Sequence, residues 1–128
     1  MKLCISSTGQ NLNAVVDPRF GRATYYILID SATNDFECVE NPSAMAGGGA
    51  GTKAAQLVIN KGVQAVLTGN VGPNAFAVLN AAGIQIYTGV SGSVQSAVDL
   101  FNSGKLQAIG SPSVEAHAGM GGGKGGRA

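Results

Sequence analysis

Short apolar runs in the first third of the chain predict three β-strands. Residues 2–7 and 24–30 are rich in leucine, isoleucine, cysteine and tyrosine, and turn residues bound each run. Residues 36–40 alternate apolar and acidic side chains, which is typical of a half-exposed edge strand. The link between the second and third runs is short, so we expect these two strands to form an antiparallel hairpin.

The second half of the chain alternates predicted helices with buried strands. The segments, in chain order, are a helix over residues 53–61, a strand over 63–68, a helix over 73–82, a strand over 84–87 and a helix capped by Ser93. We expect Gly51 or Thr52 to cap the first of these helices. The last helix has apolar residues at i, i+3, i+4 and i+7, as an amphipathic helix does.

This order of elements predicts an α/β fold with a mixed five-stranded sheet and helices on both faces. Alternating strands and helices require parallel strands joined by crossover connections. The first and fourth strands are therefore expected side by side at the centre of the sheet. Three loops should leave the sheet near one end, at residues 17–23, 47–51 and 69–72.

Composition predicts one domain over residues 1–109, with a short extended piece at 105–109, followed by a flexible glycine-rich tail over residues 110–128. The 128-residue chain is 45% hydrophobic and has a formal net charge of +1. This charge gives no sign of nucleic-acid binding, and no stretch approaches the about 20 apolar residues of a membrane span. The first residues lack the apolar core of a signal peptide, so we expect a soluble, cytoplasmic protein.

Cys4 and Cys38 are the two cysteines of the chain, and each lies in an apolar, strand-like run. They do not form a CxxC pair, so the sequence encodes no local thiolate metal site or redox motif. Because a cytoplasmic compartment disfavours disulfides, we expect both to be free thiols that pack as small hydrophobic groups.

The turn GNVG at residues 69–72 joins a predicted buried strand to a helix that begins with Pro73. Its glycines permit positive φ and a close approach to the main chain. N–H groups at a helix start attract anions, and open α/β sheets bind ligands at this end of their strands. The alternative is a tight connecting turn without a ligand. The candidate anion-binding residues of this turn are Gly69, Asn70, Gly72 and Asn74.

The run GGGAG at residues 47–51 fits neither the P-loop nor the Rossmann spacing. A flexible hinge or lid is the use we expect, and the run would still offer N–H groups to an anion at the start of the helix that follows. The candidates in this segment are Gly48, Gly49 and Gly51, with Met45 beside them as a wall of the pocket.

The loop DPRFGRA at residues 17–23 carries Arg19 and Arg22, the only arginines before the tail. Planar guanidinium groups suit anionic ligands with several acceptors. Phe20, between them, is expected to line the pocket. The alternative is a solvated loop whose arginines pair with Asp17 or Asp30.

Catalysis is disfavoured by the distribution of reactive side chains. The acidic residues are scattered, so the clustered carboxylates of a two-metal nuclease are missing. His117 is the single histidine and lies in the tail, far in sequence from both cysteines. With Met120 it would suit a soft metal, although a lone tail histidine is usually solvated. We therefore expect a protein that is not an enzyme.

The motifs DPRFGRA, GGGAG and LTGNVGPNA occur in an order and at separations that resemble the dinitrogenase iron–molybdenum cofactor biosynthesis family. The resemblance covers residues 1–109 and implies a stand-alone, single-domain member with a ribonuclease H-like fold. It also implies non-enzymatic binding, carrying or scaffolding of a metal–sulfur cluster that contains molybdenum, with iron or copper. Members related to nitrogenase often have histidine in place of Arg19, so electrostatic capture is implied here rather than metal ligation by this loop.

Two functions remain open from the sequence. In the first, the protein carries an anionic metal–sulfur cluster, held without covalent bonds, between cluster-donating and cluster-accepting proteins, and it is a monomer or weak dimer. In the second, it is a small regulatory or nucleotide-binding module that uses the turn at residues 69–74. The visible spectrum and metal content of the purified protein distinguish them.

Overall fold

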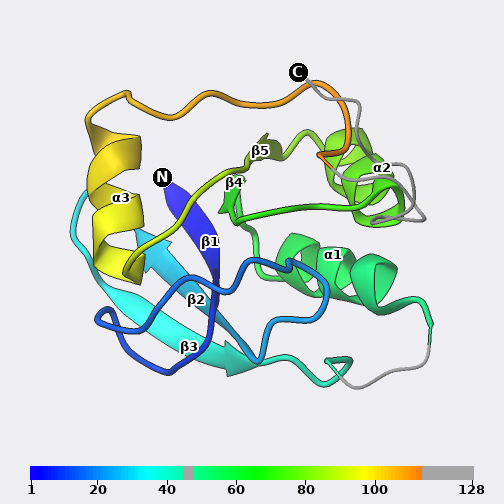
Figure 1. Cartoon of the computed structure of the whole chain (residues 1–128), viewed down its shortest axis with the longest axis horizontal. Coiled ribbons are helices and arrows are strands. Elements are labelled where there is room, and N and C mark those ends of the chain that lie inside the picture. Colours follow the sequence, from blue (N-terminus) through cyan, green and yellow to red (C-terminus); the bar gives the residue numbers. More distant parts are fainter. Residues whose placement is uncertain (45–47, 114–128) are drawn as a thin grey trace.

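The computed structural model describes residues 1–44 and 48–113 of the chain (Figure 1). The expectations for Met45, His117 and most of the tail fall outside these residues. The described elements, in chain order, are β1 (Lys2–Ser7), β2 (Tyr25–Asp30), β3 (Phe36–Glu40), α1 (Ala50–Asn60), β4 (Ala65–Leu67), α2 (Pro73–Ala81), β5 (Gln85–Tyr87) and α3 (Val94–Asn102). In this part of the chain, no helix is both long enough and apolar enough to cross a membrane.

The strands form one mixed sheet in the order β3-β2-β1-β4-β5. On one side, β1 pairs antiparallel with β2, from Lys2 opposite Asp30 to Ser7 opposite Tyr25. On its other side, β1 pairs parallel with β4, and β4 pairs parallel with β5. The predicted hairpin of β2 and β3 is present, and so is the predicted central pairing of β1 with β4.

Helices cover both faces of this sheet, as predicted (Figure 1). Successive residues of a strand point to opposite faces. Cys4 and Val66 are buried with residues of α1 and α2, whereas Ile5 and Leu67 are buried with residues of α3. Both faces of the central strands are thus covered, which explains their continuous apolar sequence. The expected α/β architecture is confirmed, while the ribonuclease H-like label stays a prediction.

The loops of the candidate site leave the same end of the sheet. Because β1, β4 and β5 are parallel, their carboxyl ends point in one direction. The antiparallel pairing of β2 with β1, and of β3 with β2, brings the end of β3 to the same side. The connections that follow β1, β3 and β4 therefore meet at one end, as the sequence predicted.

The start of α1 differs from the prediction. The helix begins at Ala50, and its N-cap is Gly49, which takes a left-handed φ of 73°. The expected cap at Gly51 or Thr52 is therefore wrong. A left-handed N-cap turns the chain into the helix earlier, and Ala50, which is 5% exposed, anchors the first turn in the core.

The segment after α3 adds an extended piece to the edge of the sheet, as expected. Ala108 bridges Tyr87 in an antiparallel sense, and the N–H of Ile109 donates to the carbonyl of Ile86 at 2.8 Å. The mobility of residues 110–128 stays a prediction.

The two cysteines differ in access, which yields a labelling prediction. Both are free, Cys4 is fully buried, and Cys38 is half-buried on β3. Burial raises the pKa of each thiol, and strongly so for Cys4. We expect iodoacetamide at mildly alkaline pH to alkylate Cys38 in the folded protein and to spare Cys4 until denaturant is added. Peptide mass spectrometry measures both sites, and equal rates in the folded protein would contradict this burial.

Candidate anion-binding site

The loop after β1 crosses the turn after β4 at the carboxyl end of the sheet. The N–H of Asn70 donates to the carbonyl of Pro18 at 2.7 Å, and the N–H of Phe20 donates to the carbonyl of Asn70 at 3.1 Å. These bonds form a short parallel bridge between Arg19 and Asn70. Two of the three predicted segments are thus joined through their main chains.

Glycines let these segments pass one another at close range. A Cβ on Gly69 would lie 2.6 Å from the Cα of Pro18, and one on Gly21 would lie 2.9 Å from the Cα of Gly51. A Cβ on Gly51 would lie 3.3 Å from the Cβ of Ala75. The loop after β1, the first turn of α1 and the first turn of α2 therefore pack in succession, which brings the third predicted segment to the site.

Helices α1 and α2 begin next to each other without side-chain caps. Their N-cap residues are Gly49 and Gly72, and no side chain of the described residues caps either helix. In α3, by contrast, the Ser93 hydroxyl accepts the N–H of Ser96 at 3.0 Å. Neither α1 nor α2 has an acidic residue in its first turn. First-turn N–H groups lack acceptors within the helix and carry partial positive charge, so this pair of helix starts favours an anion.

The two arginines of the loop after β1 are held differently. The side chain of Arg19 is 65% exposed, and its Nε lies 3.5 Å from Oδ1 of Asp17. Arg22 is half-buried, and its Nη1 donates to the carbonyl of Ala44 at 3.2 Å. The predicted pairing with Asp17 is found for Arg19, while Asp30 lies at the opposite end of the sheet. Arg19 therefore presents its charge to solvent beside Asn70.

Two buried hydroxyl groups, at the ends of β1 and β4, hold the start of the loop after β1 by hydrogen bonds. The Ser6 hydroxyl donates to the carbonyl of Asp17 at 2.7 Å, and it lies 2.7 Å from the hydroxyl of Thr68. Because the Ser6 proton goes to Asp17, Thr68 is the donor in the second bond. Both hydroxyl-bearing residues are fully buried. They tie β1 and the end of β4 to the start of the loop at residues 17–23, which we call the arginine loop.

The remaining candidates divide between surface and core. Gly48, Gly49 and Asn74 are exposed at the helix starts. Phe20 is only 1% exposed, and its ring packs against Tyr26 with centroids 5.5 Å apart. The expectation that Phe20 lines an open pocket therefore needs correction, because its side chain anchors the loop in the core.

The backbone of the turn after β4 also differs from the prediction. Gly72 has an ordinary extended conformation, with φ of −83°, and Gly69 is outside the left-handed region. Gly69 is needed for the close approach of Pro18 rather than for positive φ. The N–H of Asn70 is occupied by Pro18, so the donors that helix geometry leaves for a ligand are those of Asn74 and Ala75.

The chain beyond the predicted domain returns to this turn. The N–H of Val71 donates to the Ser113 hydroxyl at 2.8 Å, and the N–H of Ser113 donates to the carbonyl of Val71 at 3.1 Å. No pattern in the sequence indicates this contact, because Ser113 lies among turn residues without periodicity. The described chain thus ends beside the start of α2.

Direct coordination of a metal ion is not what the described residues offer. Among them, no group of three or more histidine, cysteine, aspartate or glutamate side chains could hold a metal ion. Cys4 is buried, and its raised pKa opposes formation of the thiolate that a metal would need. The donor set at the helix starts instead fits a preformed anion that accepts hydrogen bonds.

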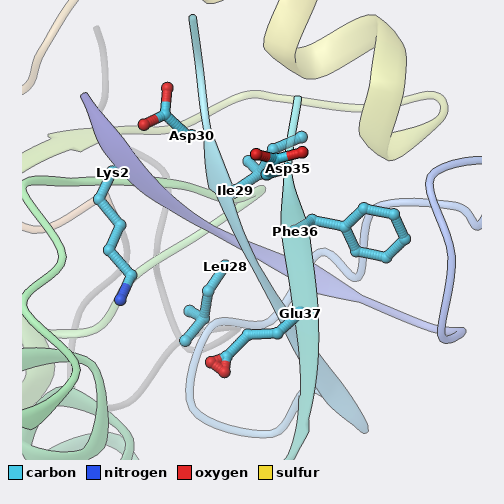
Figure 2. A pocket seen from close by; sticks show the side chains of 7 residues that line it. All are labelled: Lys2, Leu28, Ile29, Asp30, Asp35, Phe36 and Glu37. Carbon is cyan, nitrogen blue, oxygen red and sulfur yellow. The ribbon is translucent and has the colours of Figure 1, made fainter. Parts of the chain in front are cut away.

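A shallow groove of about 250 Å³ lies away from this site, where β1 begins and the edge strand β3 starts (Figure 2). Its lining includes the carboxylates of Asp30, Asp35 and Glu37 and the ammonium group of Lys2. This charge is predominantly negative, and none of the predicted binding residues lines the groove. It is therefore a poor candidate for an anion site.

The fold and the loops together describe a small α/β domain with a candidate anion site, built from two helix starts and an arginine-bearing loop, at one end of its sheet. The family model of the dinitrogenase iron–molybdenum cofactor family matches residues 1–104, and the chain belongs to that family.

Sequence and structure comparisons agree with this membership. The chain is 32% identical over 98 residues to the uncharacterized protein MJ0580 of Methanocaldococcus jannaschii, covering 74% of this chain and 83% of that protein. The fold is similar to the apo form of the orange protein from Desulfovibrio gigas, with a TM-score of 0.84 and 38% identity over 87% of this chain and 94% of that one. It is also similar to the Thermotoga protein TM1290, with a TM-score of 0.73 and 41% identity over 84% and 91%.

Two glycines of one turn give a matched test of the loop crossing. We expect Gly69→Ala to lower the free energy of unfolding by about 1–3 kcal/mol, because its methyl group would collide with the backbone of Pro18. Gly72→Ala should change it by about 0.5 kcal/mol or less, since a Cβ there meets no atom of the described residues within 4 Å. Urea unfolding measures both, and equal stability of the two variants would contradict the crossing.

Proposed function

We propose that this protein binds and carries an anionic metal–sulfur cluster without covalent bonds, and that it is not an enzyme. The observation that carries the proposal is the pair of uncapped helix starts, after Gly49 and Gly72, packed together beside the loop of Arg19 and Arg22. The first-turn N–H groups of two helices, which have no acceptor within their own helix, and a guanidinium group lie there at one end of the sheet.

The chemistry of a sulfide cluster matches these donors. Its surface sulfides spread negative charge over a large volume and accept weak hydrogen bonds. Helix N-termini provide N–H groups and partial positive charge, and arginine provides a planar set of donors. A protein that binds the anionic surface of a cluster needs no side chain that coordinates the metal. Arginine, rather than histidine, at position 19 agrees with this mode of binding.

Membership of the dinitrogenase iron–molybdenum cofactor family supports a cargo that contains molybdenum and iron. Copper in place of iron as the second metal is part of the proposal. The similar orange protein has an apo form, as a protein that takes up and releases a bound group does. The exposure of Arg19, Gly48 and Asn74 leaves the site open to other proteins. In this role the chain, as a monomer or weak dimer in the cytoplasm, receives a cluster from a donor protein and passes it to an acceptor.

Purification from cells supplied with molybdenum tests the class of ligand. We expect charge-transfer bands in the visible spectrum, together with molybdenum and either iron or copper in the metal analysis. A nucleotide phosphate would meet the same N–H donors, and the protein would then show purine absorbance without metal. Protein reconstituted from the apo form with tetrathiomolybdate and a copper or iron salt provides the reference spectrum.

Charge reversal at Arg19 tests the arginine loop. We expect Arg19→Glu to weaken binding of tetrathiomolybdate with copper about tenfold, and Arg19→Ala to weaken it less, because the reversed charge repels the anion. Arg19→Ala should lower the free energy of unfolding by about 1 kcal/mol or less, because the Arg19 side chain is exposed although its partner Asp17 is buried. Arg19→Glu should lower it further, because it places a second carboxylate beside Asp17. Absorbance titration and thermal unfolding measure the two effects.

Lys61→Glu is the matched control for this charge change. Lys61 caps the far end of α1, about 15 Å along the helix from its start, and is exposed. Its reversal alters the net charge as much as Arg19→Glu does and should leave affinity nearly unchanged. If both Arg19 variants bind as tightly as the parent protein, the loop after β1 is only a connector and the anion site fails.

A further inference from the structure

Asn41 lies directly after β3 and is 6% exposed. Its side-chain amide donates to the carbonyl of Gly21 at 3.1 Å and to the carbonyl of Ala23 at 2.8 Å. These two carbonyls flank Arg22 in the chain. An asparagine before a proline is an ordinary turn signal in a sequence, so this position carries no local sign of its long-range contacts.

The same amide contacts a buried phenol. Nδ2 of Asn41 lies 3.1 Å from the Tyr26 hydroxyl, which in turn donates to the carbonyl of Phe20. The single proton of the phenol is used on Phe20, so the hydroxyl accepts from Asn41. Burial, with the nearby Cys4 and Asp17, raises the pKa of Tyr26 above its usual range, and the phenol remains a donor. The side chains of Tyr26 and Asn41 thus bind three carbonyls of the arginine loop, those of Phe20, Gly21 and Ala23.

The other groups of Asn41 hold the connection that leads toward α1. Its Oδ1 accepts the N–H of Ser43 at 3.0 Å, and its main-chain carbonyl accepts the N–H of Ala44 at 3.3 Å. The carbonyl of Ala44 accepts Nη1 of Arg22 at 3.2 Å. Asn41 therefore fixes both the backbone on either side of Arg22 and the acceptor of the Arg22 side chain.

We propose that Asn41 is a positioning residue, which sets the conformation of the arginine loop for ligand binding by holding the carbonyls around Arg22 and the turn at Ala44. This inference rests on the proposed function. Asn41 does not itself contact the ligand. Its amide orientation is fixed by chemistry, because the oxygen faces an N–H donor while the nitrogen faces three acceptors.

The isosteric variant Asn41→Asp is the sharpest probe. It replaces the donating nitrogen by an oxygen that faces the carbonyls of Gly21 and Ala23, so these contacts become repulsive. We expect the backbone amide resonances of residues 19–23 and of Ala44 to shift in a two-dimensional NMR spectrum. Affinity for tetrathiomolybdate with copper should fall roughly tenfold.

Asn102→Asp is the matched control. The amide of Asn102 also donates to a main-chain carbonyl, that of Ser31 at 3.0 Å, but on an exposed surface of α3. This variant should keep the amide resonances of the arginine loop and the affinity of the parent protein. Tyr26→Phe is the second probe if Asn41→Asp does not fold, since it keeps the buried ring and removes only the hydroxyl between Asn41 and Phe20.

A double-mutant cycle with Arg22→Ala separates positioning from a general loss of stability. If Asn41 acts through the arginine loop, Arg22→Ala should weaken binding severalfold in the parent and less than about twofold in the Asn41→Asp background. Additive losses, or unchanged affinity in a folded Asn41→Asp protein, would overturn the proposal. If the parent itself does not bind the probe, the proposed function fails, whereas unshifted loop amides in Asn41→Asp would reject the positioning role alone.

Discussion

The close passage of the loop after β1 across the turn after β4 is the constraint on which the site depends. At Gly69 the two backbones approach so closely that a methyl group would lie 2.6 Å from the Cα of Pro18. This approach allows Asn70 to accept the N–H of Phe20 while it donates to Pro18. The arginine loop is thereby held against the sheet in one register. Without this crossing, the loop would be a surface connection whose polar groups bond mainly to water.

A set of buried hydrogen bonds, in addition to the crossing, restricts the conformation of the arginine loop. Ser6 and Thr68 fix the start of the arginine loop, while Tyr26 and Asn41 fix its end. A single intramolecular hydrogen bond contributes only about 1 kcal/mol net, but leaving a buried partner unpaired costs more. These contacts therefore act chiefly as a restriction on loop conformation. The loop can present Arg19 to solvent because the residues around it are tied to the core.

The sequence allowed the β2–β3 hairpin, the central pairing of β1 with β4 and the meeting of the three loops to be predicted, because hydrophobic periodicity and crossover rules determine topology. It did not allow the roles of individual glycines to be separated. Gly69, Gly72 and Gly49 look alike in a sequence, yet one permits a close contact, one has an ordinary conformation and one is left-handed. Those differences depend on which backbone lies opposite, and that is decided by tertiary packing.

Among the site residues, too, some positions could be predicted from the sequence and others could not. Arg19 could be placed on a surface loop because a charged side chain beside turn residues is rarely buried. For Phe20 the sequence favours a pocket wall, whereas in the structure its ring packs inward against Tyr26. The contributions of Asn41 and Ser113 come from long-range hydrogen bonds to main-chain groups, which leave no local pattern.

Under the proposed function, the glycine N-caps of α1 and α2 also link the bound cluster to the lifetime of the protein. Without a bound anion, the protein lacks the roughly 0.3–1 kcal/mol of stabilisation that an acidic first turn would contribute at each helix start. An anion bound only by the folded chain restores this stabilisation, and by mass action it shifts the equilibrium away from opened states. Proteases cleave chains that have opened. Under the proposed function, empty carriers are therefore degraded faster than loaded ones, so the surviving population is enriched in molecules that hold a cluster.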